Sequence, residues 1–135
     1  MRTEILPAGE MPAMTADHMR QAIVAAYGAY ETDDRDTLEK LIAADFSFTS
    51  PYDNSIDKPT YFERCWRNSD WIERHELERI FVEGDEAFIT YRCVAKGGKT
   101  FRNTEFFSFE GSKVKRIDVY FGATYDNGAF VRQPG

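Results

Sequence analysis

Apolar residues recur at helical spacing through the first part of the chain. Thr15 is a suitable N-cap, and the pattern after it predicts a helix that ends near Asp33. The apolar positions of this helix share one face: Met19, Ile23, Ala26, Tyr27 and Tyr30. A second, shorter amphipathic helix is predicted after a break at Asp33 and Asp34, with its apolar face made by Leu38, Leu41 and Ile42.

The period then changes to two. Across residues 46–49, Phe alternates with Ser and Thr, and Pro51 ends the run, which predicts a short strand. The strand is expected to lead into a loop over residues 52–57, which are rich in turn formers. Pro59 suits the first turn of a third helix, expected to run to Trp66.

Everything after about Trp71 is predicted to be sheet. Turn sequences containing Gly separate four strand-like segments, near residues 72–83, 86–96, 100–110 and 113–121. Helices followed by an antiparallel meander predict an α+β fold, with a curved antiparallel sheet wrapped around the N-terminal helices as a cone with an internal pocket. Residues 1–13 lack periodicity and are expected to form a flexible arm, before a single domain over residues 14–135.

Composition and charge exclude several function classes. The 135 residues carry a formal charge of −6, which argues against nucleic acid as a partner because phosphate binding needs a basic face. No apolar run approaches the roughly 18 residues of a membrane span, and no targeting segment is visible, so we expect no membrane partner and a cytoplasmic location. With two cysteines, no His and carboxylate cluster and no glycine-rich phosphate loop, we expect no metal and no cofactor.

Glu105 is the leading candidate for chemistry. The two-residue period of the segment near 100–110 places Glu105 on the same face as three phenylalanines and Asn103. Inside a pocket, desolvation would raise its pKa and suit it to proton transfer. The alternative is structural, in which Glu105 pairs with an arginine such as Arg92 or holds a hydrogen-bond network.

Further candidates lie near the predicted pocket. Ser50, Tyr52 and Asp53 leave a strand end together, and Asp53 is also an ordinary turn residue. His75 can act as a base or have a structural role, and a thiolate pair with Cys65 is the less favoured interpretation.

Aromatic residues make up 15% of the chain, more than a small core needs, and we expect them to line the pocket. The predicted ligand-binding residues are Tyr30, Tyr52, Phe62, Trp66, His75, Tyr91, Asn103, Phe107, Val119 and Phe121. The opposite sheet face mixes polar and aromatic side chains, which favours a homodimer interface over a solvated face. Its members are Arg102, Thr104, Phe106, Arg116, Asp118 and Tyr120.

The order of elements and three stretches resemble the SnoaL-like family of the nuclear transport factor 2-like superfamily, which includes ketosteroid isomerase. These stretches are FSFTSPYD (46–53), YFERCWRN (61–68) and NTEFFSFEGSKVKRIDVYF (103–121). The resemblance covers residues 16–122 and implies the cone fold. In the isomerase pattern Ser50 stands where the base is an Asp, the oxyanion-hole Tyr falls near Ala26 beside Tyr27, and the second acid falls at Glu105.

Two functions follow as hypotheses. The first is an isomerase, cyclase or hydratase type of enzyme that uses Glu105 as acid and base on a small hydrophobic or polyketide-like carbonyl compound. Ser50, Asp53 and Tyr27 are further catalytic candidates, and Tyr27, Tyr52 or Tyr91 can donate to a developing oxyanion. The second is a non-catalytic module that binds a small hydrophobic ligand or acts as a dimeric accessory protein.

Overall fold

The structure of the protein, a computed structural model, describes residues 15–132. Its helices are α1 (Ala16–Thr32), α2 (Arg35–Leu41) and α3 (Lys58–Cys65), the last continued by a 3₁₀ helix (Trp66–Asp70). Its strands are β1 (Ile42–Ser50), β2 (Asp53–Ile56), β3 (Ile72–Glu83), β4 (Glu86–Ala95), β5 (Lys99–Glu110), β6 (Lys113–Asp126) and β7 (Ala129–Val131). The flexible arm predicted for residues 1–13 lies outside the described residues.

The three helices form where the sequence predicts, with two differences at their ends: Ile42 begins β1 instead of closing α2, and Trp66 begins the 3₁₀ helix. Thr15 accepts a hydrogen bond from the backbone N–H of His18 at 3.2 Å, which caps α1. Asp33 ends α1 in the left-handed conformation, with φ of 57°. Asp34 then caps α2, and Asp57 caps α3, whose first turn contains a proline. A short polar side chain therefore satisfies one N–H group in the first turn of each of the three α-helices.

The strands form one sheet in the order β2-β1-β6-β5-β4-β3, and β7 pairs with β6. The α+β class and the curved sheet are confirmed, with one correction: the sheet is mixed, because β1 runs parallel to β6. Hairpin turns predict only pairings between neighbouring segments of the chain, whereas β1 and β6 lie far apart in sequence. The loop predicted over residues 52–57 instead contains β2, which pairs antiparallel with β1.

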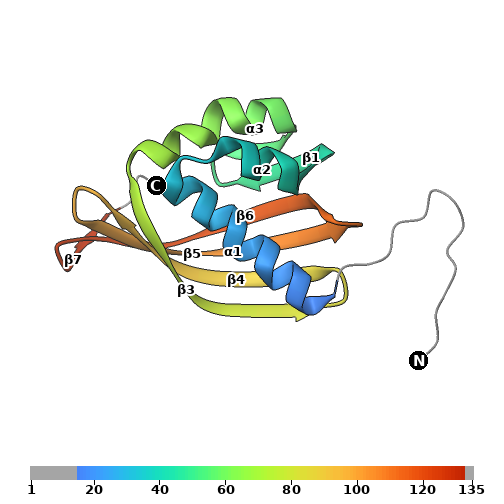
Figure 1. The fold of residues 1–135 in the computed structure, drawn as a ribbon. Helices are drawn as coiled ribbons and strands as arrows, with labels where there is room; N and C mark the ends of the chain where they lie inside the picture. Colours follow the sequence, from blue (N-terminus) through green and yellow to red (C-terminus); the bar gives the residue numbers. More distant parts are fainter. Residues whose placement is uncertain (1–14, 133–135) are drawn as a thin grey trace, which may run out of the picture.

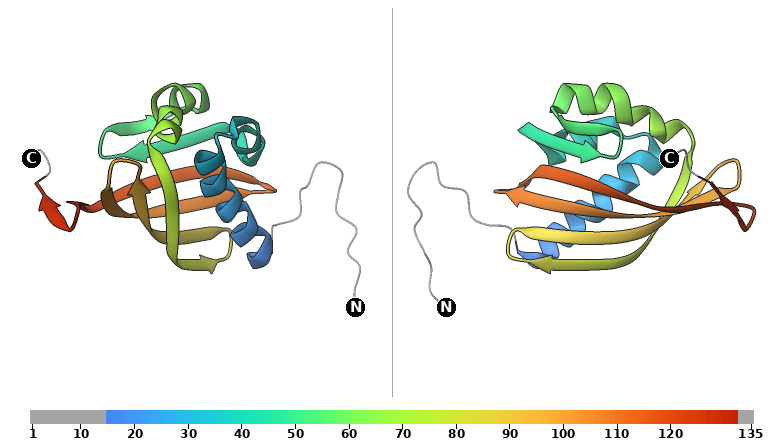
Figure 2. Two further views of the ribbon diagram at one scale, coloured as in Figure 1. Left: turned by 60° about the vertical axis from the view of Figure 1, so that its left-hand side comes forward. Right: turned by 180° about the vertical axis from the view of Figure 1, so that it is seen from behind.

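The sheet curves around the helices, which cover its concave face (Figures 1 and 2). Register shifts interrupt the pairing of β3 with β4, and of β5 with β6 between Phe101 and Asn103. Opposite this second shift lies Gly122, where a Cβ atom would come within 2.3 Å of the carbonyl oxygen of Arg102. Such irregularities bend and twist strands, and a residue without a side chain permits the close approach here.

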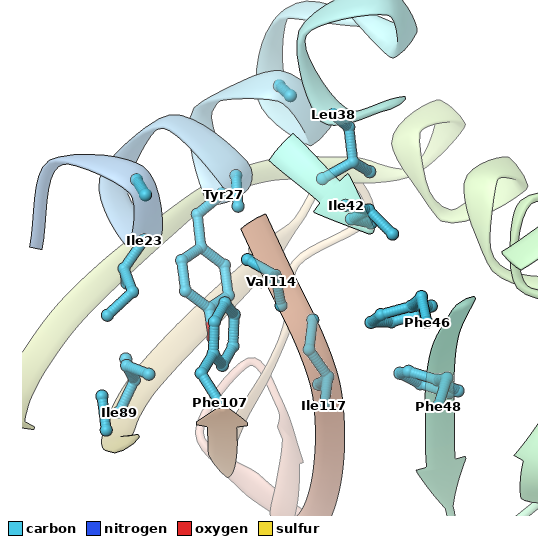
Figure 3. Close-up of a cluster of buried hydrophobic side chains, with 14 of the residues drawn as sticks. Ile23, Tyr27, Leu38, Ile42, Phe46, Phe48, Ile89, Phe107, Val114 and Ile117 are labelled. Carbon is cyan, nitrogen blue, oxygen red and sulfur yellow. The ribbon is translucent and has the colours of Figure 1, made fainter. Parts of the chain in front are cut away.

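A core of apolar side chains joins the helices to the concave face. Figure 3 shows Tyr27 and Ile23 of α1 directed toward Phe107 of β5 and Ile89 of β4. Leu38 of α2 is 1% exposed and Phe107 is also 1% exposed, so both elements are firmly anchored. The alternation of buried and less buried residues along β5 confirms the predicted two-residue period of this strand.

Candidate functional site

The concave face encloses a cavity of about 580 Å³. Such a volume suits a small organic molecule, and most of the lining is aromatic or aliphatic. Twelve of the predicted site residues line it: Tyr27, Tyr30, Ser50, Tyr52, Asp53, His75, Tyr91, Asn103, Glu105, Phe107, Val119 and Phe121. Phe62 and Trp66 do not, because Phe62 packs under the guanidinium of Arg35 and Trp66 packs against Tyr30.

Glu105 lies in this cavity as a buried carboxyl group, 8% exposed. The hydroxyl of Tyr91 donates to Glu105 Oε2 at 2.5 Å, and Asn103 Nδ2 donates to the same Tyr91 oxygen at 3.1 Å. Strand register explains the chain of bonds, since Tyr91 of β4 faces Asn103 of β5, and Asn103 shares its face with Glu105. Burial raises the pKa of Glu105 to about 7, although the hydrogen bond from Tyr91 and the nearby Tyr27 hydroxyl oppose the rise.

The predicted alternative pairing of Glu105 with Arg92 is wrong. Arg92 lies on the opposite face of the sheet, where its Nη1 bonds Glu76 Oε1 at 2.8 Å. It is the cross-strand partner of Arg102, and neighbouring residues on a strand point to opposite faces, so Tyr91 and Arg92 diverge. Glu105 therefore has a hydrogen-bond donor in Tyr91 but no cationic partner among residues 15–132.

Tyr27 brings a second phenol to the carboxyl group. Its ring lies 5.0 Å from that of Tyr91 and 4.9 Å from that of His75, measured between centroids. The Tyr27 hydroxyl is buried and makes no hydrogen bond of good geometry within the described chain, but it lies close enough to Glu105 for each group to shift the pKa of the other. Burial, followed by the nearby Glu105 carboxylate, raises the pKa of Tyr27 well above its usual value. The hydroxyl therefore stays protonated and can donate a hydrogen bond.

His75 is a neutral polar group in the wall. Its backbone N–H donates to Glu31 Oε1 at 2.8 Å, while its Nδ1 is buried without a hydrogen-bond partner in the described residues. Burial lowers the pKa of His75 to about 4, so the ring is uncharged at neutral pH. Burial also raises the pKa of Cys65 to about 12, and a thiol that remains protonated is a poor nucleophile. These values argue against the thiolate pair.

Ser50 and Asp53 lie together, away from the hydrogen bonds of Glu105. They adjoin the exposed lining residues Tyr52 and Arg64, and we call this part of the cavity its mouth. Ser50 Oγ donates to Asp53 Oδ2 at 3.1 Å, and Arg64 Nη1 lies 2.9 Å from Asp53 Oδ1. Above them, the exposed ring of Tyr52 packs edge-on against Phe121 at a centroid distance of 5.4 Å. Arg64 was not among the predicted site residues, because in its helix only the aromatic residues Tyr61, Phe62 and Trp66 and Cys65 were expected on the inner face. Arg64 and Asn68 are four residues apart, which places two polar side chains on the same side of the helical segment, and this spacing was the signal in the sequence.

The polar groups of the cavity suit proton transfer and hydrogen bonding to a small molecule. Across residues 15–132, no group of three or more His, Cys, Asp or Glu side chains is arranged to hold a metal ion. In the same part of the chain, none of the helices has the length and apolar character needed to cross a membrane.

Similar proteins are found among solved structures and by a family model. No curated protein matches the chain. Among solved structures, an NTF2-like protein of unknown function from Cytophaga hutchinsonii is similar, with a TM-score of 0.65, 18% identity, and coverage of 90% of this chain and 94% of that one. A protein with a ketosteroid isomerase-like fold from Catenulispora acidiphila, solved with trimethylamine, has a TM-score of 0.61, 16% identity, and coverage of 76% and 85%.

A third similar structure is a candidate polyketide cyclase from Sinorhizobium meliloti, with a TM-score of 0.60, 17% identity, and coverage of 76% of this chain and 98% of that one. At these identities the likeness concerns the fold alone. The family model of the SnoaL-like domain matches residues 23–117, well over half of the chain. The protein therefore belongs to the SnoaL-like family, and it has the NTF2-like, ketosteroid isomerase-like fold.

Proposed function

We propose that the protein is an enzyme that transfers a proton on a small, mainly apolar carbonyl compound, with Glu105 as acid and base. The observation that carries the proposal is a buried carboxyl group in an apolar cavity with a pKa raised to about 7. Near neutral pH both protonation states of such a group are populated, so it can accept a proton and return it. The fold's relatives, which include a candidate polyketide cyclase, are consistent with carbonyl chemistry.

The proposed step starts with the carbonyl oxygen of the substrate near the Tyr27 hydroxyl. The Glu105 carboxylate removes a proton from the carbon next to the carbonyl, the electron pair of that C–H bond forms a carbon–carbon double bond, and the π pair of the carbonyl moves to its oxygen. Tyr27, whose hydroxyl makes no hydrogen bond of good geometry among the described residues, donates to the resulting enolate oxygen. The protonated Glu105 then returns the proton to a carbon of the enolate. Tyr91 holds the carboxyl group throughout.

Exchange of α-protons tests this step without knowledge of the natural substrate. We would incubate 2-tetralone with the protein in D₂O and follow deuterium incorporation by NMR. The wild type is expected to exceed the buffer rate, and Glu105→Gln to lose about 10²-fold or more, typical of a missing acid or base. Glu110→Gln, an exposed acid on the same strand, is the matched control. Tyr91→Phe should move the pH midpoint of exchange upward, because it removes a bond that lowers the Glu105 pKa.

Two results would contradict the proposal. Exchange that survives Glu105→Gln at the wild-type rate would exclude Glu105 as the acid and base. Tight binding of 2-tetralone without exchange above the buffer rate would favour the alternative function, a non-catalytic module that binds a small ligand.

We also propose that two copies associate through the outer sheet face, the side away from the helices. This face exposes Phe81, Phe88 and Tyr120, at 69%, 49% and 57%, and Phe88 packs on Phe106 with ring centroids 5.2 Å apart. Positively and negatively charged side chains lie among the aromatic residues, for example the ion pair of Arg102 with Glu78. A face with clustered aromatics and charges of both signs is compatible with its own copy across a two-fold axis.

The predicted cytoplasmic location stays a prediction.

A further inference from the structure

The mouth of the cavity carries positive charge, although the chain has a formal charge of −6. Arg64 and Arg132 both line the cavity, and a guanidinium group stays protonated at physiological pH. The carboxylates that line it are Asp53, at the mouth, and Glu105, which is half protonated near pH 7. An anion bound in the outer part of the cavity can therefore contact an arginine side chain.

A buried carboxylate holds Arg64 in place. Arg64 Nη1 lies 2.9 Å from Asp53 Oδ1, and the other oxygen of Asp53 accepts from Ser50 Oγ at 3.1 Å. The Asp53 side chain is 9% exposed, whereas that of Arg64 is 52% exposed. Asp53 is thus covered and its oxygens are engaged, while the guanidinium of Arg64 faces the opening.

Arg64 and Asn68 both offer hydrogen-bond donors to the cavity. Arg64 uses one nitrogen for Asp53, and its other guanidinium nitrogens contact no acceptor within residues 15–132. Asn68 follows four residues later and also lines the cavity. Its Oδ1 accepts from Trp71 Nε1 at 3.2 Å, so the acceptor of this amide is occupied and its two N–H donors remain. A group of donors around one cation suits a ligand group that only accepts hydrogen bonds.

Arg64 and Glu105 act on the same stretch of cavity wall. Cys65, next to Arg64 in the chain, also lines the cavity, and its pKa is raised by burial first and then by Asp53, with smaller effects of Arg64, which lowers it, and Glu105, which raises it. Because Arg64 and Glu105 line one cavity of about 580 Å³, a single small molecule can contact both.

We propose that the ligand is an apolar keto acid whose carboxylate binds Arg64 and Asn68 at the mouth while its carbonyl lies at Tyr27 and Glu105. The position of the carbonyl rests on the proposed function, whereas the carboxylate site stands on the Arg64 geometry. The planar guanidinium matches a carboxylate, and such charge-assisted bonds are stronger than neutral ones. A monoanion fits better than a phosphate dianion, because Asp53 neutralises part of the Arg64 charge and the whole chain is acidic.

A matched pair of probes tests the inference by binding alone. The probes are 4-oxo-4-phenylbutanoate and 4-oxo-4-phenylbutanamide, which differ in the charge of one end. Calorimetry at pH 6 keeps Glu105 largely protonated while the probe acid is ionised. The wild type is expected to bind the carboxylate about tenfold or more tightly than the amide, as one charged hydrogen-bonded contact provides. Arg64→Gln should abolish this preference, and Arg64→Lys, which keeps the charge, should retain part of it.

Arg67→Gln is the control, because Arg67 is exposed, lies three residues away and does not line the cavity. It should keep the preference, and so should Glu105→Gln, which separates this site from the proposed catalysis. Equal affinity of the wild type for both probes, no binding of either, or an equal loss in Arg67→Gln and Arg64→Gln would each overturn the inference. If the protein fails to exchange the α-protons of 2-tetralone, the proposed catalysis is wrong, but the expected preference for the carboxylate probe does not change.

Discussion

The pH dependence of stability offers a direct test of how deeply Glu105 is desolvated. Burial raises its pKa from 4.5 to about 7, so between these values the folded state keeps a proton that the unfolded chain releases. Stability must then fall as the pH rises through this window. At about 1.36 kcal/mol for each pH unit, the loss above pH 7 is about 3 kcal/mol. Glu105→Gln cannot ionise and should not show this loss.

His75 works in the opposite direction over nearly the same range. Burial lowers its pKa from 6.5 to about 4, so the unfolded chain takes up a proton before the folded state does. Its contribution is fully present above pH 6.5 and is lost as the pH falls toward 4, again by about 3 kcal/mol. In the wild type the slopes from Glu105 and His75 largely cancel between about pH 4.5 and 6.5. Each single variant should therefore reveal the slope that the other residue produces.

Urea unfolding between pH 4.5 and 8 measures these slopes. The stability of Glu105→Gln relative to wild type should rise by about 3 kcal/mol across this range, whatever the offset caused by the altered bond to Tyr91. His75→Gln should show the reverse trend relative to wild type. Glu110→Gln, with an exposed side chain on the same strand, should follow the wild-type curve closely. A difference between Glu105→Gln and wild type that is constant with pH would refute the reasoning, because it would mean that the carboxyl group is well solvated.

Two other predictions concern the sheet and its outer face. Gly122→Ala should destabilise the protein by about 2 kcal/mol or more in urea unfolding, because its Cβ would meet the Arg102 carbonyl oxygen at 2.3 Å. Gly28→Ala in α1 meets no atom within 4 Å and should instead stabilise by about 0.5 to 1 kcal/mol, so equal effects of the two changes would contradict this account. Phe88→Lys on the outer face should convert a dimer to a monomer in sedimentation velocity, and a wild type that sediments as a monomer would exclude the proposed interface.

Local physics made the helices and hairpins predictable. Thr15 satisfies N–H groups within its own turn of chain, and glycine turns join strands that are neighbours in sequence. The two-residue period likewise placed Glu105 among apolar side chains on one face of β5, which the burial pattern confirms. These features depend on residues within a few positions of each other, so the sequence displays them directly.

Pairings between distant segments were not predictable in this way. The parallel pairing of β1 with β6 depends on how the curved sheet closes around the helices, and no turn sequence encodes it. Two short strands, β2 and β7, exist because a neighbouring strand offers an edge to each. For the same reason, the sequence did not decide whether Glu105 lies in a pocket or pairs with an arginine.

The sequence by itself determined the helices and the strands of the hairpins, the face on which Glu105 lies and the likeness to a family of small cone-shaped domains. Tertiary structure decided the chemistry available there. The raised pKa of Glu105 requires desolvation by side chains from several elements, and its hydrogen bond requires Tyr91 on the adjacent strand. The link between Arg64 and Asp53 requires that α3 lie over the end of β1. Desolvation and ion pairing act over a few ångströms through space, and only the folded chain sets those distances.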